Sequence, residues 1–597
     1  MKKSLLFFVS MCLFSLSADA TPLLKTLNFR HHHWQGTIKQ DGSRVCLKDD
    51  NCASIEKVTD GELTLIWDKW GKDEFVYNPN LNIWQSKVSL ENDARFQIQK
   101  QYEEAFYTFE EPFIVVNPFK KTPLSAMMKF ETDEPMQITI RIQPKGQAPE
   151  IMHTFKGFNL QHEQHELPIL GLYPNDVTTV ELEGKNKKGK IFKSTHKIKT
   201  GGTDYDGQWF VMKKKDKDFR YYANYDGVVF DETGCIRYQF QYGGWVLTYF
   251  YKDFVFVETK RSIQKWSILG EFVKEYQYPE GFYGYMHGMN FKDNDNLLVF
   301  GTFEGTTALI DGEEMPTNRD FILELNAKTG EVEAKYDLAE MLNADRSLAV
   351  KSVFKEYGFV DWAHTNGIDY DAKNRAIIVS GRHFGMAKID EKTKKPIWWL
   401  TPHQHIEKSG RKGDKGPLHH LMLTAVDEKG KPFSKSVQMG IKKANGFKWP
   451  LKSHSVKYAG SGYYSILDNS GSVFDKNLYT TENSVASVFY IDDKKKTVKQ
   501  VFLKELPVYS EVGSSIIFNP QTKESLVSLS TVRSKNNFRL ANSFIYRFNE
   551  KGDLIYQAAM QKDTNGGTYL FQPFEFYAKN NWPTPNENLK KKWFSFE

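Results

Sequence analysis

The sequence contains few cysteines and no long apolar run beyond its first 20 residues. Only 4 of the 597 residues are cysteine. A helix that spans a bilayer needs about 20 mostly apolar residues, so no membrane-spanning helix is predicted after the N-terminus. No glycine-rich loop that would cradle a phosphate is found, and no nucleotide is predicted as a cofactor. The net charge is only +6, with lysines interspersed among acidic residues, which argues against nucleic-acid binding.

Helical periodicity is also scarce, whereas residues that favour strands are abundant. The chain has 44 Phe, 29 Tyr and 13 Trp, together with many Val, Ile and Thr, and these residue types favour strands. A chain of this length is expected to fold as several domains. The composition therefore predicts an all-β protein of more than one domain.

The N-terminus has the pattern of a secretory leader. Lys2 and Lys3 form a basic start, residues 5–16 are apolar, and Ala18-Asp19-Ala20 fits a cleavage site with small residues. Residues 1–20 are therefore predicted to be a signal peptide. The protein is expected to be exported, most simply to the periplasm of a Gram-negative bacterium.

Removal of that leader would leave three cysteines. Cys46 and Cys52 lie six positions apart, which is consistent with a disulfide across a hairpin in an oxidising compartment. Cys235 lies among strand residues and is interpreted as a buried structural thiol.

The remaining chain divides into three predicted regions. Residues 21–108 form a strand-rich extension that carries the cysteine pair. Residues 109–202 alternate short strands with turns, which indicates a β-sandwich domain. Residues 203–597 contain repeats of one hairpin pattern, and such repeats are typical of a β-propeller.

Six repeats predict a six-bladed propeller. The repeats are interrupted by insertions at 341–360 and 401–446, which are expected to form loops on one rim. The six repeats are 205–242, 243–283, 284–340, 361–400, 451–506 and 512–575.

Three histidines open successive repeats and carry the functional prediction. His287, His454 and Ser514 each stand four residues before an aromatic residue, and Asn366 has that position in the fourth repeat, two residues after His364. Equivalent positions of a repeat occupy equivalent places in a propeller. We therefore expect these side chains to converge on the central channel.

Arg382 adds a permanent positive charge to this set. It follows the second strand of the fourth repeat in IIVSGRH. Together with the histidines it predicts a cationic pocket for an anionic group. Three alternatives remain at this point: histidines with a structural role at blade corners, a zinc site with three histidine ligands, and a non-catalytic propeller that binds sulfated or acidic ligands.

Several motifs resemble those of the bacterial arylsulfate sulfotransferases that work without the donor PAPS, and the resemblance covers most of the chain. The insertion FSKSVQMGIKK lacks the cysteines that form a short-range disulfide in that family, and residues 21–108 make the N-terminal part longer than usual. The motifs are VVNPFKKTPLSAMMKFET, HELPILGLYPND, DWAHTNGIDYD with IIVSGRH, LMLTAVDEKGKPF and GFKWPLKSHSVKY.

The resemblance implies a mechanism and a role for each site residue. His454 would attack an aryl sulfate and form a sulfohistidine, which a phenolic acceptor would discharge in a ping-pong reaction. Arg382, His364 and His287 would act on the sulfuryl group or its leaving group as catalytic residues, and Asn366 and Ser514 would bind the substrate. The partners would be small aryl sulfates and phenols, without nucleic acid, membrane, metal or other cofactor, and the family suggests a homodimer.

Overall fold

The computed structural model describes residues 23–577 with internal gaps, and the predicted leader at 1–20 lies outside the described residues. Strands dominate, and the described helices are short. None of these helices has the length and apolarity needed to cross a membrane. The helices are α2 (Ala94–Glu103), α3 (Leu338–Met341), α4 (Lys435–Gln438) and the 3-10 turn η2 (His419–Leu421). The gaps are 31–34, 49–50, 70, 79–82, 88–93, 156–163, 206, 216–218, 244–245, 311, 319, 346–357, 407–415, 472–475, 535–536 and 562–569.

The chain forms two compact units, residues 1–105 and 106–597. In the first unit, one curved sheet has the order β2-β1-β8-β7-β6-β5-β4-β3. Its two end strands are neighbours in sequence, and Ile38 between them donates its N–H to the carbonyl of Leu27 at 2.9 Å. The sheet therefore closes on itself as a small barrel. Its strands are β1 (Asn28–Arg30), β2 (Gln35–Thr37), β3 (Lys39–Asp41), β4 (Arg44–Lys48), β5 (Asn51–Val58), β6 (Glu62–Trp67), β7 (Gly71–Asn78) and β8 (Ile83–Ser86).

Side chains fill the interior of this barrel. The buried core includes Phe29, Trp67, Phe75 and Trp84, and the rings of Phe29 and Phe75 meet edge to face at 5.1 Å. Cys46 lies opposite Cys52 in the β4–β5 hairpin, and the predicted disulfide between them is confirmed.

The second unit begins with two facing antiparallel sheets that confirm the predicted β-sandwich. Along β14 every second residue is buried, as expected for a strand with one face in a core. Phe109 lies between the sheets: its ring meets Phe130 of the first sheet at 5.7 Å, and a Cβ on Gly184 of the second would approach it to 3.2 Å. The sheets are β9 (Phe113–Val116), β10 (Ala126–Glu131) and β13 (Gln164–Ile169), and β11 (Met136–Ile142), β12 (Ile151–Thr154), β14 (Val177–Asn186) and β15 (Ile191–Lys199).

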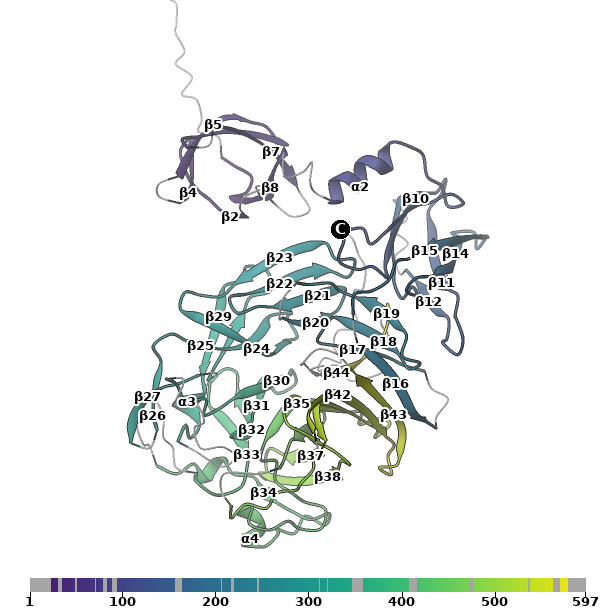
Figure 1. Ribbon diagram of the computed structural model, residues 1–597. Coiled ribbons are helices and arrows are strands. Elements are labelled where there is room, and N and C mark those ends of the chain that lie inside the picture. Colours follow the sequence, from purple (N-terminus) through teal and green to yellow (C-terminus); the bar gives the residue numbers. More distant parts are fainter. Residues whose placement is uncertain are drawn as a thin grey trace, which may run out of the picture. The chain divides into compact units, whose positions relative to one another are not determined.

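The rest of this unit is a series of mainly antiparallel sheets that follow the chain around a common middle (Figure 1). The first sheet holds β17 (Tyr221–Asn224), β18 (Val228–Asp231), β19 (Ile236–Gln239) and β44 (Phe571–Phe574). The second holds β20 (Leu247–Tyr251), β21 (Phe254–Glu258), β22 (Ser262–Ser267) and β23 (Phe272–Gln277). The third holds β24 (Phe282–Phe291), β25 (Leu297–Phe303), β28 (Phe321–Leu325) and β29 (Val332–Asp337), beside a hairpin of β26 (Thr307–Ile310) and β27 (Glu313–Pro316).

Three further sheets complete the series. The fourth holds β30 (Thr365–Asp371), β31 (Ala376–Gly381), β32 (Gly385–Asp390) and β33 (Pro396–Leu400). The fifth holds β34 (Thr424–Ala425), β35 (Ser453–Gly460), β36 (Tyr463–Asp468), β37 (Val485–Asp492) and β38 (Thr497–Glu505). The last holds β16 (Gln208–Lys214), β39 (Tyr509–Ser510), β40 (Ser515–Phe518), β41 (Ser525–Ser534), β42 (Asn537–Phe548) and β43 (Leu554–Gln561).

Apolar clusters join each sheet to the next. The rings of Tyr238 in the first sheet and Phe250 in the second meet edge to face at 5.7 Å. Apolar clusters follow between the second and third sheets, the third and fourth, the fourth and fifth, and the fifth and last. A further cluster joins the last sheet to the first, where Tyr222 and Tyr556 stack at 5.9 Å. The sheets thus form a closed ring, which confirms the predicted propeller arrangement. Because the chain is described with gaps, the count of six blades stays a prediction.

Two strand exchanges close the ring. The C-terminal strand β44 pairs with β17 in the first sheet, and β16 pairs with β43 in the last (Figure 1). The sequence assigned 205–242 to a single repeat, whereas its first strand belongs to the last sheet. Pairing between the first and last repeats is not visible in a repeat pattern. This pairing protects sheet edges that would otherwise remain open.

A buried ion pair lies at this closure. Glu232, next to β18, accepts a hydrogen bond from Arg547 of β42 at 2.7 Å, and both side chains are fully buried. Glu232 also accepts from Tyr222 at 2.9 Å and from Lys214 of β16 at 2.6 Å. Burial raises the pKa of Glu232 and lowers that of Arg547 to about 10. The pair therefore depends on the mutual neutralisation of two desolvated charges.

Arg547→Met should lower the free energy of unfolding by about 3–5 kcal/mol, because the buried Glu232 carboxylate loses one of its charged partners and keeps only Lys214 and Tyr222. Urea unfolding followed by tryptophan fluorescence measures the change. As a control, Lys523→Met removes the exposed pair with Glu550 and should leave the free energy of unfolding almost unchanged. A loss no larger than that control for Arg547→Met would contradict the assigned role.

Candidate functional site

The strands that open the third, fourth and fifth sheets lie side by side and are tied together by one carboxylate. Asp369 of β30 is fully buried and accepts hydrogen bonds from the Asn290 side chain of β24 at 2.7 Å and from the N–H of Tyr458 in β35 at 2.8 Å. It also accepts from the N–H of Tyr370 at 2.8 Å. Burial raises the pKa of Asp369, while Lys457 and these hydrogen bonds oppose the shift.

Each of these three strands has an irregularity at its predicted site residues. The pairing register shifts between Gly284 and Met289 in β24, which brackets His287, and between Thr365 and Gly367 in β30, which brackets Asn366. In β35 it shifts directly after His454. His364 and Ser455 have positive φ angles of 45° and 53°. Such bulges redirect side chains out of the regular alternation of a strand. A register shift or a positive φ angle therefore occurs at or beside each predicted histidine.

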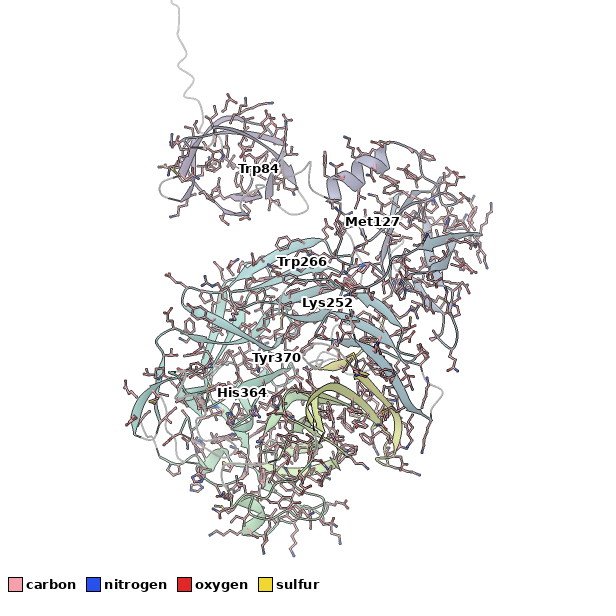
Figure 2. The ribbon with its side chains drawn as sticks, in the orientation of Figure 1. Trp84, Met127, Lys252, Trp266, His364 and Tyr370 are labelled. Atoms are coloured by element: carbon pink, nitrogen blue, oxygen red, sulfur yellow. A yellow bond between two sulfur atoms is a disulfide. The ribbon has the colours of Figure 1, made fainter. Side chains whose placement is uncertain are left out.

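The three predicted histidines come together, with His364 in the middle. Figure 2 labels His364. The ring centroid of His364 lies 5.4 Å from that of His287 and 6.4 Å from that of His454. A fourth ring, His383, lies 5.6 Å from His364. The repeats thus bring residues that are far apart in sequence to one place.

Close approach of β30 and β35 requires a glycine at position 367. A Cβ built on Gly367 would lie 2.5 Å from the Val456 nitrogen, 2.5 Å from the Ser380 hydroxyl and 2.9 Å from the Ser455 Cα. Backbone atoms cannot move aside as a side chain can. The glycine after Asn366 therefore permits the two strands to meet directly beside His454.

His454 is almost completely buried, at 1% exposure. Burial lowers its pKa well below the usual range, and the positive charge of Arg382 lowers it further, followed by His364 and His287. The imidazole of His454 is therefore neutral near pH 7. A neutral imidazole has a free ring nitrogen that can act as a nucleophile.

Asn469, directly after β36, supports this ring. The Asn469 side chain opposes the fall in the pKa of His454. The amide nitrogen of Asn469 donates to the Ser510 carbonyl at 2.8 Å, so the amide oxygen is the atom left for the imidazole. Within the described part of the chain, that oxygen and Nδ1 of His454 are both buried and have no hydrogen-bond partner, which leaves each available to the other.

His364 is held by a carboxylate. Its Nδ1 lies 2.6 Å from Oδ2 of Asp361, which is only 4% exposed. A carboxylate at Nδ1 orients the ring and leaves the other ring nitrogen to face away from the carboxylate. His364 is therefore equipped to take up and release a proton.

Arg382 follows β31 and lies at the boundary with the last sheet, where it donates to the Glu511 carbonyl at 3.4 Å. Lys452 lies nearby and is 6% exposed. Burial lowers the pKa of Lys452 and the charge of Arg382 adds to the effect, while Asp468 and Glu511 oppose it. Two cations thus accompany the histidines.

The two predicted substrate-binding residues are buried and engaged with the protein. The Asn366 amide donates to the Ser453 carbonyl at 2.7 Å and accepts from Ser380 at 3.3 Å. The Ser514 hydroxyl accepts from the N–H of Ser530 at 2.9 Å. Both residues brace the strands around His454, and their contact with substrate stays a prediction.

Sequence reasoning missed Asp361 and Asn469. Asp361 precedes His364 by three positions in DWAH, a spacing that carries no clear signal on its own. Asn469 follows β36 as Arg382 follows β31. An alignment of the repeats at the ends of their second strands, in addition to the residues that open each repeat, would have found Asn469.

The loop without the family's cysteines is held by side-chain hydrogen bonds. Gln438 of α4 accepts from the N–H of Ala425 at 2.9 Å and donates to its carbonyl at 2.8 Å. The indole of Trp449 donates to the Val437 carbonyl at 2.7 Å. These bonds connect the insertion to the segment that leads to His454.

No group of three or more His, Cys, Asp or Glu side chains suited to a metal ion occurs among the residues that the structure describes.

Comparison with protein families yields two matches. Residues 195–570 match the family described as Arylsulfotransferase (ASST), and residues 113–201 match the Arylsulfotransferase Ig-like domain. The first match alone covers more than half of the chain.

Two curated relatives carry the name arylsulfate sulfotransferase AssT. The protein from Escherichia coli O6:H1 is 27% identical over 271 residues, 40% of this chain and 43% of the relative. The protein from Lelliottia amnigena is 25% identical over 321 residues, 48% of this chain and 51% of the relative. The chain therefore spans about half the length of these relatives or less.

Among solved structures, the β-propeller domain of Cps50 (Swd1) from Myceliophteria thermophila is similar, with 12% identity and a TM-score of 0.27. It covers 60% of this chain and 86% of its own. The assignment of a propeller comes from the strand pairing and the packing between the sheets of this chain.

Gly367→Ala should separate β30 from β35, lower the unfolding free energy by about 1–3 kcal/mol, and displace His454. Thermal unfolding measures the first effect and the His454 signal in a histidine NMR spectrum the second. Gly243→Ala is the control, because a Cβ there meets nothing within 4 Å. Equal behaviour of the two variants would contradict the close-approach argument.

Proposed function

The chain belongs to the arylsulfotransferase family, and from that premise we propose that it transfers a sulfuryl group from an aryl sulfate to a phenol through a sulfohistidine at His454. One observation carries the proposal. A buried imidazole that stays neutral lies beside a permanent cation, Arg382, and beside a second imidazole with its own carboxylate, His364 with Asp361. This set combines a nucleophile, an anion-binding group and a proton carrier.

In the first half-reaction, Nε2 of His454 attacks the sulfur of the donor. The S–N bond forms as the bond between sulfur and the aryl oxygen breaks, and the loose transition state resembles that of phosphoryl transfer. Arg382 and His287 stabilise the charge on the sulfuryl oxygens, each through charge-assisted hydrogen bonds of about 1.5–3 kcal/mol. The imidazolium of His364 gives its proton to the departing aryloxide.

In the second half-reaction the same groups act in reverse. Neutral His364 takes the proton of the acceptor phenol, the phenolate oxygen attacks sulfur, and the S–N bond breaks to restore His454. Phenols suit both steps because their pKa is about 10, as for Tyr: the aryloxide leaves readily and the acceptor deprotonates readily. No bound metal or nucleotide enters this scheme.

Asn469 acts as a positioning residue for His454. With its oxygen at Nδ1–H, it holds the tautomer that leaves the lone pair on Nε2. When the sulfuryl group is attached, the ring becomes an imidazolium, and the same oxygen stabilises that charge. This contribution is of the order of a hydrogen bond to a charged group, about 1.5–3 kcal/mol.

The organisation and location of the protein belong to the same proposal. We propose that residues 21–108, 109–202 and 203–597 are the three domains of the mature protein. The compact unit that ends at residue 105 and the Ig-like match at 113–201 support these limits. The disulfide and the basic, apolar start of the sequence support a periplasmic location. A homodimer, suggested by the family, is testable by light scattering.

The proposal is tested by intact mass spectrometry after brief mixing with 4-nitrophenyl sulfate without acceptor. The protein should gain one sulfuryl group, mapped to His454, release one equivalent of nitrophenol, and lose the group on addition of phenol. His454→Ala should show none of this. Folded wild-type protein that binds the ester without an adduct and without release would favour a non-catalytic binding protein.

The role of Asn469 is tested by the pH dependence of nitrophenol release in a single turnover. Asn469→Leu should slow release about 10- to 100-fold, because the charged ring loses its acceptor. In Asn469→Asp the carboxylate raises the pKa of His454, so His454 stays protonated up to a higher pH. As the pH is lowered, the rate should therefore begin to fall at a higher pH than in wild type. Asn549→Asp in an exposed turn is the control. An unchanged profile in Asn469→Asp would contradict the assignment.

A further inference from the structure

A group of buried polar side chains joins the fifth sheet to the last sheet. One member follows β36 and one precedes β37 in the fifth sheet, and the others lie in β39, before β40 and in β41 of the last sheet. Buried hydroxyls are retained at a cost unless they are hydrogen-bonded, so their bonds show what they hold in place. The members, each at most 2% exposed, are Asn469, Ser484, Ser510, Ser514 and Ser530.

Ser510 is fixed at three points. Its N–H donates to the Ser484 hydroxyl at 2.9 Å, and its carbonyl accepts from the Asn469 amide nitrogen at 2.8 Å. Its own hydroxyl donates to the Ser530 carbonyl and lies 2.7 Å from the hydroxyl of Ser514. The Ser510 peptide therefore cannot move without breaking bonds to both sheets.

The backbone of Asn469 is fixed from two sides. Its carbonyl accepts from the Ser484 hydroxyl at 3.1 Å, and its N–H donates to the carbonyl of Lys452 at 3.0 Å, two residues before His454. The single hydroxyl of Ser484 thus connects Asn469 to Ser510 and keeps this boundary next to the strand that carries His454.

The side-chain nitrogen of Asn469 faces two backbone carbonyls, those of Ser510 at 2.8 Å and Gly513 at 3.5 Å. An amide has donors on its nitrogen and acceptor lone pairs on its oxygen, so these carbonyls decide which end of the amide faces which way. The oxygen is left for Nδ1 of His454. A reversed amide would offer a donor to Nδ1 and would place the ring proton on Nε2.

The same segment of the last sheet contacts the main cation of the site. Glu511 follows Ser510, and its carbonyl accepts from the guanidinium of Arg382 at 3.4 Å. The segment ends in two successive positive φ angles, 68° at Gly513 and 79° at Ser514. Such a conformation is unfavourable for serine and persists only when surrounding bonds hold it, which is common beside functional sites.

We propose that Ser484 and Ser510 are positioning residues for sulfotransfer: they hold the Asn469 amide with its oxygen toward Nδ1 of His454 and so fix the tautomer in which Nε2 is the nucleophile. The inference depends on the proposed function and assigns the choice of the reactive nitrogen to the boundary between the fifth and last sheets.

The test is Ser484→Ala, which removes the hydroxyl between Asn469 and Ser510. In a single turnover, release of nitrophenol from 4-nitrophenyl sulfate should slow about 10- to 100-fold, because the reacting ring is no longer held in its productive form. Nitrogen NMR of enzyme with ¹⁵N-labelled histidine should show His454 protonated on Nδ1 in wild type. In the variant, a second population should appear that is protonated on Nε2.

Ser465→Ala is the matched control. It removes another buried hydroxyl bond between the same two sheets, from Ser465 to the Ile516 carbonyl at 2.8 Å. Its melting temperature should fall by about as much as that of Ser484→Ala, whereas its release rate and the tautomer of His454 should stay as in wild type.

Ser510→Ala is a second variant, which keeps the backbone bonds of Ser510 but frees this residue from Ser514 and Ser530. It should change the rate and the tautomer in the same direction as Ser484→Ala and to a smaller extent. An unchanged tautomer in both folded variants, or equal changes in Ser465→Ala, would overturn the inference. Because the tautomer is measured without substrate, wild type that forms no sulfuryl-enzyme would contradict the proposed function separately.

Discussion

The buried carboxylate of Asp369 connects the strands that carry all three candidate histidines. It accepts from Asn290 of β24, from Tyr370 within β30 and from Tyr458 of β35. A buried carboxylate is tolerated when its oxygens are hydrogen-bonded. Because these bonds set the relative register of the three strands, a bulge in each can direct a side chain to one point. The histidine cluster depends on this alignment more than on any contact between the histidines themselves.

Stability and chemistry are located in different parts of the ring. Apolar clusters between consecutive sheets, and the Glu232–Arg547 pair at the closure, hold the propeller together. The candidate site residues lie in or beside β24, β30 and β35, where His364 and Ser455 have positive φ angles. Residues in such conformations cost of order 1–3 kcal/mol each. The outer packing offsets this cost, which allows the middle of the ring to keep a neutral, buried His454.

The repeat pattern predicted much of this arrangement and failed at identifiable points. Hydrophobic alternation indicated the sheets, and the equivalent repeat positions of His287, His364 and His454 predicted that these side chains lie together. Arg382 was found because it follows a strand end, yet Asn469 at the matching place was not, because the repeats were compared at their starts and not at the ends of their second strands. Ring closure by β16 and β44 was missed because pairing between the first and last repeats leaves no local periodicity. Lys452 was not recognised either, because burial of a lysine depends on the neighbouring sheet.

The central claim is that Nε2 of His454, with Nδ1 held by Asn469, carries the sulfuryl group among Arg382, His287 and His364. A crystal structure of the enzyme treated with 4-nitrophenyl sulfate in the absence of acceptor tests it most directly. The account predicts a sulfur atom bonded to Nε2 of His454, its oxygens in contact with Arg382 and the two other histidines, and Nδ1 donating to the Asn469 oxygen. Sulfur on Nδ1, or on any other residue, would contradict it.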